Sequence, residues 1–150
     1  MKLNLVDILA TQRNRHPLLF IDKITDISPG EYATAIKNYT YNEWYFPSHF
    51  DDDPNVPGFI QIESLVQTFL MTFLTLDGMA GNKTNFLKID NASFKRKIIP
   101  GDISTINATL ESFKRGIAKG YAESSVDGEK ACRANFLVSV PSILETYRPK

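Results

Sequence analysis

The sequence predicts an α+β fold in which a curved antiparallel sheet wraps around one long central helix. Two strand-like segments precede residue 42, an apolar segment with few breakers covers residues 58–76, and strand-like segments separated by turns run from residue 81 to the end. A helix that is apolar nearly all round has to be buried. The economical way to bury it is to fold the strands around it as one sheet.

Length and composition favour a single domain over residues 1–150. A chain of 150 residues can bury most of its unfolded surface. Its content of 43% hydrophobic and 23% charged residues is typical of a globular protein. Because 17 Lys and Arg residues balance 17 Asp and Glu residues, the net charge gives no reason to expect binding to nucleic acid or to a membrane.

Cysteine usage and hydropathy indicate the compartment. Cys132 is the only cysteine, which excludes an intrachain disulfide and a cysteine-rich metal site and favours a reducing compartment. The first residues lack the apolar core of a signal peptide. No segment reaches the roughly 18 uninterrupted apolar residues of a membrane span. We therefore expect a cytoplasmic protein.

The first 41 residues are predicted to form a short helix and a β-hairpin. Residues 5–12 carry apolar side chains at helical spacing. Residues 17–27 form a strand-like run that ends at the turn Ser28-Pro29-Gly30, and residues 31–41 alternate well enough for the partner strand.

The apolar segment is predicted to be a helix from about Gly58 to Leu76 that stops near Gly78. The second half of the chain then gives strands. The segment 85–98 precedes the turn Pro100-Gly101-Asp102, and residues 103–113 precede a turn region at 116–120. Residues 121–126 and 130–140 flank Asp127-Gly128, which is a hairpin signal.

Glu63 places a carboxylate inside this apolar helix. The residues one turn away on its face are mainly apolar: Phe59, Ile60, Val66, Gln67 and Leu70. Burying an unpaired charge costs several kcal/mol, so a buried Glu63 needs a raised pKa or a hydrogen-bond partner. Alternatively, Glu63 lies on a solvated strip with Ser64 and Gln67. Periodicity alone leaves both interpretations open.

His49 and Gly58 are the other candidates for chemistry. His49 lies before the helix, in a segment with several aromatic residues and two prolines, which is typical of a loop that displays reactive groups. Alternatively, His49 only stacks among these aromatic residues. Gly58 leaves a backbone N–H at the positive end of the helix dipole, where it can polarise a carbonyl, although every helix start has free N–H groups.

Two charged groups have weaker signals. Asp51, Asp52 and Asp53 lack the spaced ligands of a calcium loop, so we interpret them as a charged turn and predict no metal. The basic residues are solvated strand ends or, alternatively, a docking surface: Lys95, Arg96, Lys97, Lys114 and Arg115.

Taken together, these residues resemble the (3R)-hydroxyacyl-(acyl-carrier-protein) dehydratases, a family with the hot-dog fold. The similarity covers nearly the whole chain. The segment HPLLFIDKITDISPGEYATAIKNYTYNE is similar to the first hairpin of that family. The active-site pattern is matched in spacing by His49-Phe50, Pro54, Pro57-Gly58 and Glu63-Ser64-Leu65-Val66-Gln67. Phe94-Lys95-Arg96 and Pro100-Gly101-Asp102 are similar to its later strand pair.

The resemblance implies a hot-dog fold whose long helix is the filling, in a homodimer that is often assembled further into a trimer of dimers. It implies that His49 of one subunit is the base for the C2 proton and that Glu63 of the other is the acid for the departing hydroxyl. The Gly58 N–H would polarise the thioester carbonyl. Pro57, Phe50 and Gln67 would bind substrate, the five basic residues would dock acyl carrier protein, and no cofactor is required.

The chain departs from the family beside His49. The family usually has Gly before the histidine and Pro-Gly after His-Phe, where this chain has Ser48, Asp51 and Asp52. The departure favours a specialised member that takes an unusual acyl chain or acts in a secondary lipid or polyketide route.

The predicted function is dehydration of 3-hydroxyacyl thioesters, on acyl carrier protein or coenzyme A, to trans-2-enoyl thioesters in fatty acid or related synthesis. One alternative is a hot-dog protein that binds a carrier or a partner subunit without catalysis. A weaker alternative is a thioesterase, but His49 favours dehydration over hydrolysis. Isomerising relatives typically have Asp at the position of Glu63, so the glutamate favours dehydration without isomerisation.

Overall fold

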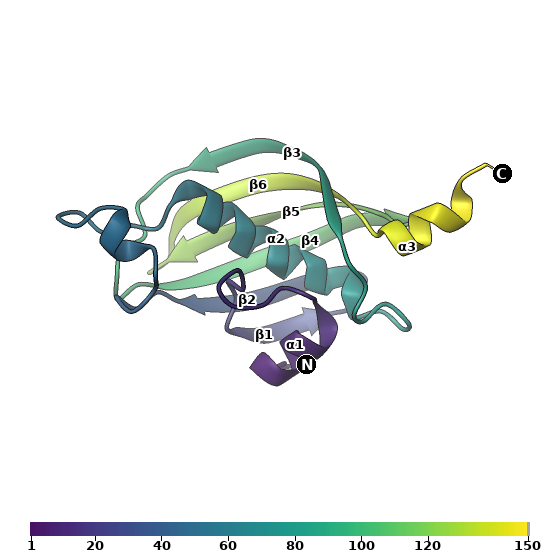
Figure 1. Ribbon diagram of the computed structural model, residues 1–150, viewed down its shortest axis with the longest axis horizontal. Coiled ribbons are helices and arrows are strands. Elements are labelled where there is room, and N and C mark those ends of the chain that lie inside the picture. The colour runs from purple at the N-terminus through teal and green to yellow at the C-terminus, as the bar shows by residue number, and fades with distance from the viewer. Residues whose placement is uncertain (150) are drawn as a thin grey trace.

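The structure is a computed structural model that describes residues 1–149, and it consists of one sheet and several helices (Figure 1). The helices are α1 (Leu5–Thr11), α2 (Gly58–Leu74) and α3 (Pro141–Leu144), with short 3-10 helices η1 (Phe46–Ser48) and η2 (Glu145–Tyr147). The strands are β1 (Lys23–Ser28), β2 (Tyr32–Asn38), β3 (Asn85–Phe94), β4 (Ile103–Lys114), β5 (Ile117–Val126) and β6 (Glu129–Ser139).

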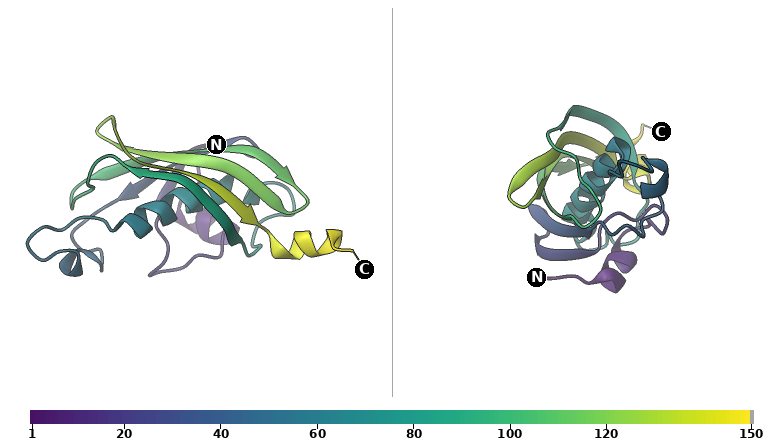
Figure 2. Two further views of the ribbon diagram at one scale, coloured as in Figure 1. Left: turned by 90° about the horizontal axis from the view of Figure 1, so that it is seen from above. Right: turned by 90° about the vertical axis from the view of Figure 1, so that its left-hand side faces the viewer.

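All six strands belong to one antiparallel sheet with the order β1-β2-β4-β5-β6-β3. The sheet curves around α2, which lies along its concave face (Figure 2). The prediction of an α+β fold with a curved antiparallel sheet around a long central helix is therefore confirmed. No helix within residues 1–149 has the length and apolar character needed to cross a bilayer.

Aromatic rings fix α2 against the sheet. Phe69 stacks on Phe136 of β6 with the ring centroids 5.8 Å apart, and Phe73 stacks on Phe113 of β4 at 5.1 Å. Both α2 rings are fully buried. Every residue of α2 from Ser64 to Leu74 is buried, so only the first turns of the helix reach the surface of the molecule.

The predicted turn region at 116–120 is wrong. The turn is confined to Arg115 and Gly116, which have φ of 52° and 81°, and β5 begins at Ile117. Gly120 lies inside β5 for a different reason: a Cβ there would come within 2.1 Å of the Thr109 carbonyl oxygen and 2.6 Å of the Phe69 ring. One glycine serves the turn and the other serves packing.

Several predicted boundaries also differ. β1 begins at residue 23 rather than 17, because residues 18 and 20 bond to an α2 side chain instead of a strand. α2 ends at residue 74 and β3 at residue 94, both earlier than predicted. Residues 141–147 are helical, not strand-like, since Pro141 occupies the first turn of α3, where proline is favoured.

Candidate active site

Glu63 is largely buried on α2. Desolvation raises the pKa of its carboxyl, while a hydrogen bond from Gln67 lowers it by a smaller amount. The solvated-strip interpretation is wrong, because Ser64 is 2% and Gln67 is 0% exposed. Glu63 is thus a carboxyl that its surroundings favour in the protonated form.

Gln67 holds the Glu63 carboxyl in place and is itself fully hydrogen-bonded. Its Nε2 donates to Glu63 Oε1 at 3.1 Å and to the Leu18 carbonyl oxygen at 2.8 Å. Its Oε1 accepts from the Phe20 N–H at 2.7 Å. Gln67 therefore joins the catalytic candidate on α2 to the extended segment that precedes β1.

His49 lies in the loop between η1 and α2, where a backbone carbonyl selects its tautomer. Its Nδ1 is 3.0 Å from the Asn55 carbonyl oxygen. A carbonyl only accepts, so Nδ1 carries a proton, and in the neutral ring Nε2 therefore has the free lone pair. The ring also stacks on Phe50 at 4.4 Å, and the Phe50 ring is 52% exposed. The two interpretations of His49 are therefore compatible: the ring stacks on an aromatic side chain and also has the tautomer that a general base needs.

Asn55 closes this loop, and the sequence analysis missed it. Its N–H donates to the His49 carbonyl oxygen at 2.9 Å, and its side-chain amide donates to the carbonyl oxygens of Asp53 at 3.0 Å and His49 at 3.4 Å. Phe50 and Asp53 exchange backbone hydrogen bonds of 2.9 and 3.2 Å. An asparagine among aspartates in a loop was the only available signal.

Gly58 is the first residue of α2, after the buried Pro57. Its N–H has no hydrogen-bond partner in the part of the chain that the structure describes. A Cβ at Gly58 would lie 3.1 Å from the Phe94 ring, so glycine permits this close approach. Gly58 lines a pocket of about 400 Å³ together with Lys95, Arg96 and Lys97.

The basic residues fall into two separate groups. Lys97 pairs with Asp53 at 2.8 Å, and Arg96 lies 3.5 Å from Asp102. Lys114 and Arg115 lie at the other end of β4, roughly 35 Å away at about 3.3 Å per strand residue. The docking prediction remains a prediction for both groups, but only the first adjoins the Gly58 pocket.

The Asp51-Asp52-Asp53 segment is an exposed turn, as predicted. Within residues 1–149, His, Cys, Asp and Glu form no group of three or more that could hold a metal ion.

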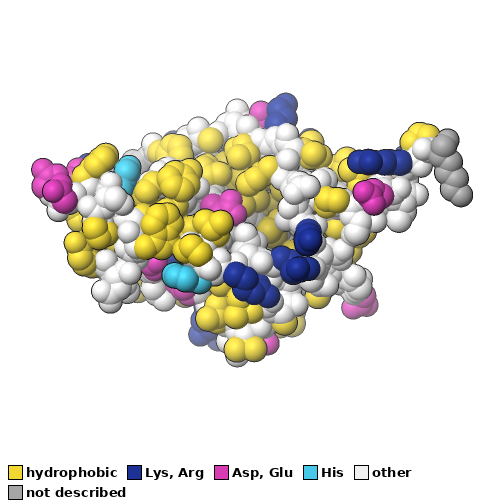
Figure 3. All heavy atoms as spheres, in the orientation of Figure 1, with side chains coloured by type: hydrophobic (Ala, Val, Ile, Leu, Met, Phe, Trp, Pro, Cys, Tyr) yellow, Lys and Arg dark blue, Asp and Glu magenta, His cyan; other side chains and the backbone are white. Residues whose placement is uncertain are grey.

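His49 and Glu63 do not meet within one chain: among residues 1–149 they share no hydrogen bond, and His49 lines neither of the two cavities described below that Glu63 lines. The surface near Glu63 is instead apolar and open. Figure 3 shows apolar side chains gathered on this face. The exposed ones beside Glu63 are Leu18, Phe59, Phe86 and Ile89.

β3 has the exposure of a strand without a full set of neighbours. Nine of its ten residues are exposed, and within the described chain it pairs only with β6, so its outer edge is free. Long apolar edge strands are liabilities that proteins usually cover.

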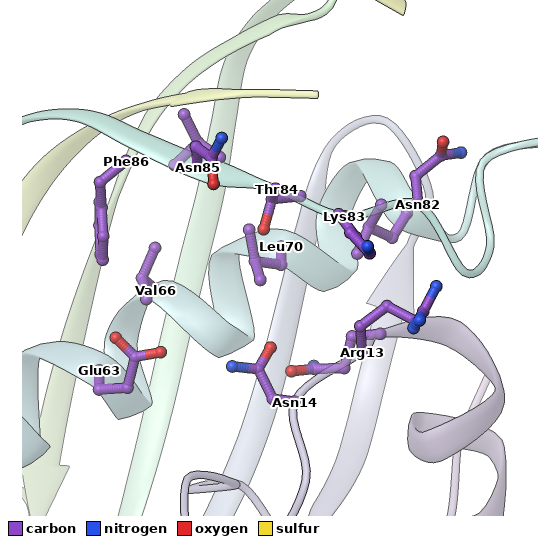
Figure 4. A pocket seen from close by; sticks show the side chains of 13 residues that line it. Arg13, Asn14, Glu63, Val66, Leu70, Asn82, Lys83, Thr84, Asn85 and Phe86 are labelled. Carbon is purple, nitrogen blue, oxygen red and sulfur yellow. The ribbon is translucent and has the colours of Figure 1, made fainter. Parts of the chain in front are cut away.

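Two cavities meet at Glu63, and both are also lined by Asn14 and Phe86. The first, here the amide-lined pocket, has a volume of about 290 Å³ and runs from Glu63 to Arg13 and Lys83 (Figure 4). The second, here the apolar groove, has a volume of about 500 Å³, and its other walls are Leu18, Phe20, Phe59, Ile62 and Ile89.

Comparison with known proteins identifies relatives over most of the chain. A family model described as a FabA-like domain matches residues 13–135. The 3-hydroxyacyl-(acyl-carrier-protein) dehydratase FabZ of Latilactobacillus sakei is 41% identical over 128 residues, which cover 85% of this chain and 91% of the relative. FabZ of Clostridium novyi is 35% identical over 140 residues, 93% of this chain and 99% of the relative.

Solved structures are similar in fold. The dehydratase heterocomplex ApeI:P from Xenorhabdus doucetiae matches with a TM-score of 0.78 at 13% identity, covering 95% of this chain and 97% of the other. PH1136 from Pyrococcus horikoshii matches with a TM-score of 0.67 at 12% identity, covering 87% and 91%. At such identity the likeness concerns the fold alone, and it confirms the predicted hot-dog fold. The sequence matches go further, and by them the chain belongs to the FabA-like family, with the FabZ 3-hydroxyacyl-(acyl-carrier-protein) dehydratases as its relatives.

Proposed function

We propose that this chain dehydrates 3-hydroxyacyl thioesters, carried on acyl carrier protein, to trans-2-enoyl thioesters in fatty acid or related lipid or polyketide synthesis. The observation that carries the proposal is Glu63, a carboxyl that burial favours in its protonated form and that Gln67 holds in place. A neutral carboxyl can act as an acid near neutral pH. The FabZ relatives bear the name of this reaction.

The reaction needs a base, an acid and a polarising donor. His49 Nε2 takes the C2 proton, since Nδ1 is bonded to the Asn55 carbonyl. Glu63 gives its proton to the C3 hydroxyl, which leaves as water. The free Gly58 N–H stabilises the thioester oxygen as C2 gains negative charge. Each acid–base contribution is typically worth about 10²–10⁴-fold in rate.

The active site is shared between two copies of the chain. His49 and Glu63 of one chain do not meet, and the free edge of β3 with its apolar side chains is suited to pairing with a second copy. His49 of one subunit would then complete the site with Glu63 of the other. Assembly into a trimer of dimers and a cytoplasmic location stay predictions.

Acyl carrier protein would dock at Lys95, Arg96 and Lys97, because these residues line the pocket that contains Gly58. Carrier proteins are acidic, so basic side chains at the entrance favour encounter. Lys114 and Arg115 would contact only a more distant part of a carrier. Coenzyme A thioesters are the alternative substrate.

The proposal is tested by following the absorbance of an enoyl thioester as purified protein hydrates it. His49→Ala and Glu63→Gln are each expected to lower the rate by about 10²-fold or more. If the folded wild type is no faster than either variant on short and medium chains, the enzyme assignment is refuted and a non-catalytic binding protein is favoured. Release of free thiol would indicate a thioesterase.

A further inference from the structure

The amide-lined pocket begins at Glu63 and follows one stripe of α2. Glu63, Val66, Leu70 and Leu74 line it and are spaced so that they share a face of the helix. At 1.5 Å per residue, this stripe is roughly 16 Å long. Val66, Leu70 and Leu74 are buried, so the pocket has an apolar wall along its length.

The far end of the pocket is polar and electropositive. Figure 4 shows Arg13 and Lys83 at the end away from Glu63 and Phe86. Neither cation forms an ion pair with a carboxylate of residues 1–149. Both side chains are exposed, and Arg13 donates to the Gly81 carbonyl oxygen at 3.4 Å, so two solvated positive charges lie at this end of the pocket.

Amide and hydroxyl groups along the pocket are also without partners within residues 1–149. The side chains of Asn14, Thr84 and Asn85 make no hydrogen bond to any residue the structure describes, although all three line the pocket. Gln12 is 0% exposed, and its Oε1 has no partner within residues 1–149. The Gln12 Oε1 atom lies beneath the pocket surface, so the uncharged polar groups that a ligand could reach are the side chains of Asn14, Thr84 and Asn85.

The apolar groove offers the contrasting environment. Apart from Asn14 and Glu63, its walls are entirely apolar. A plain hydrocarbon tail gains from burial in the groove, whereas in the amide-lined pocket it would desolvate Arg13 and Lys83 without compensation. The two cavities thus suit acyl tails of different chemistry.

We propose that the amide-lined pocket receives the acyl chain beyond C3 and selects chains whose far end carries a carboxylate. This inference rests on the proposed function, which places the C3 hydroxyl at Glu63, where the pocket begins. Arg13 and Lys83 bind the terminal carboxylate through charge-assisted hydrogen bonds.

The test compares two medium-chain trans-2-enoyl thioesters of equal length, one ending in a methyl group and the other in a carboxylate. We expect the wild type to hydrate the carboxylate form with the higher kcat/KM. The double variant Arg13→Gln, Lys83→Gln should lose roughly 10-fold or more in kcat/KM on that form, because a hydrogen bond to a charged group is worth about 1.5–3 kcal/mol. Its kcat/KM on the methyl form should not fall, because the glutamines no longer present charges to a plain tail. Circular dichroism and thermal unfolding report that the double variant folds like the wild type.

A charge-matched control, Lys23→Gln with Lys119→Gln, removes two cations outside the pocket and should leave both substrates unaffected. If the wild type prefers the methyl form, or if the pocket variant and the control behave alike, the inference is overturned while the proposed function stands. If the wild type hydrates neither thioester, the proposed function fails and this inference with it.

Discussion

Burial and hydrogen bonding act on the Glu63 carboxyl in opposite directions, and burial is the larger effect. The raised pKa means that the folded chain keeps the Glu63 proton at pH values where the unfolded chain has lost it. The contribution to stability is therefore fully present below the ordinary pKa of a glutamate and is lost as the pH rises through the raised pKa. Placing an acid in apolar surroundings destabilises the fold at neutral pH.

Glu63→Gln should remove this loss. We expect the free energy of unfolding of the variant, relative to wild type, to increase as the pH is raised from about 4 to about 8. Urea titrations across that range measure it, with Glu111→Gln as the control because Glu111 is an exposed carboxyl. A difference between Glu63→Gln and wild type that does not change with pH would contradict the raised pKa.

Two buried glutamines of α2 allow a matched comparison of hydrogen bonding. Gln67 bonds to Glu63, Leu18 and Phe20, whereas the Gln61 side chain donates once, to the Val56 carbonyl at 3.2 Å, and its Oε1 has no partner in the described chain. Gln67→Leu strands the Phe20 N–H and the Leu18 carbonyl, at about 1–3 kcal/mol each. We expect it to lower the free energy of unfolding more than Gln61→Leu, and equal losses would refute the assigned network.

At the scale of elements, the loop between η1 and α2 shows how the chain holds His49 without the family's Pro-Gly. Asn55 bonds to the backbone of both His49 and Asp53, and its own carbonyl orients the imidazole. The ion pair of Asp53 with Lys97 is exposed, so it adds little. Asn55 is thus the positioning residue of this loop.

Asn55→Ala keeps the backbone carbonyl that bonds to His49 but removes the side-chain amide that ties the loop together, so the imidazole should move. The two cavities at Glu63 are not lined by Asn55 and should stay intact. Because a misplacement of about 1 Å costs up to roughly 10²-fold in rate, we expect kcat to fall about 10- to 100-fold with little change in KM. Steady-state hydration kinetics measure the split. Asp53→Asn, which removes the exposed ion pair, is the control and should stay within about twofold of wild type. A rise in KM alone for Asn55→Ala would place the residue in substrate binding.

At the scale of the whole molecule, a shared active site predicts complementation between inactive subunits. A mixed dimer of His49→Ala and Glu63→Gln subunits contains one site with both groups intact and one with neither. Random pairing of equal amounts makes half of the dimers mixed, so about a quarter of the wild-type activity should return. Activity is measured after the two variants are unfolded together and refolded. No recovery in a mixture that contains mixed dimers would refute the shared site.

The sequence was informative where one local property decides the structure. The apolar run around Glu63 predicted α2, and a covering sheet followed from it. Contacts between residues far apart in the sequence could not be predicted. Gln67 bonds to Phe20, 47 positions away, so the sequence did not show whether Glu63 is buried or lies on a solvated strip of the helix. Gly120 was misassigned because glycine serves both turns and close approach. The exposure of both faces of β3 depends on what surrounds the strand, which periodicity cannot report.

The free edge of β3 also governs how the protein should respond to dilution. In the proposed dimer, folding and association are linked by mass action, so the midpoint of thermal unfolding should rise with protein concentration. Below the concentration at which the subunits separate, the β3 edge of each monomer exposes unpaired N–H and C=O groups and apolar side chains, which can pair with a strand of another molecule. Very dilute preparations should therefore lose activity, and the separated subunits should aggregate more readily than the dimer when both are compared at the same concentration.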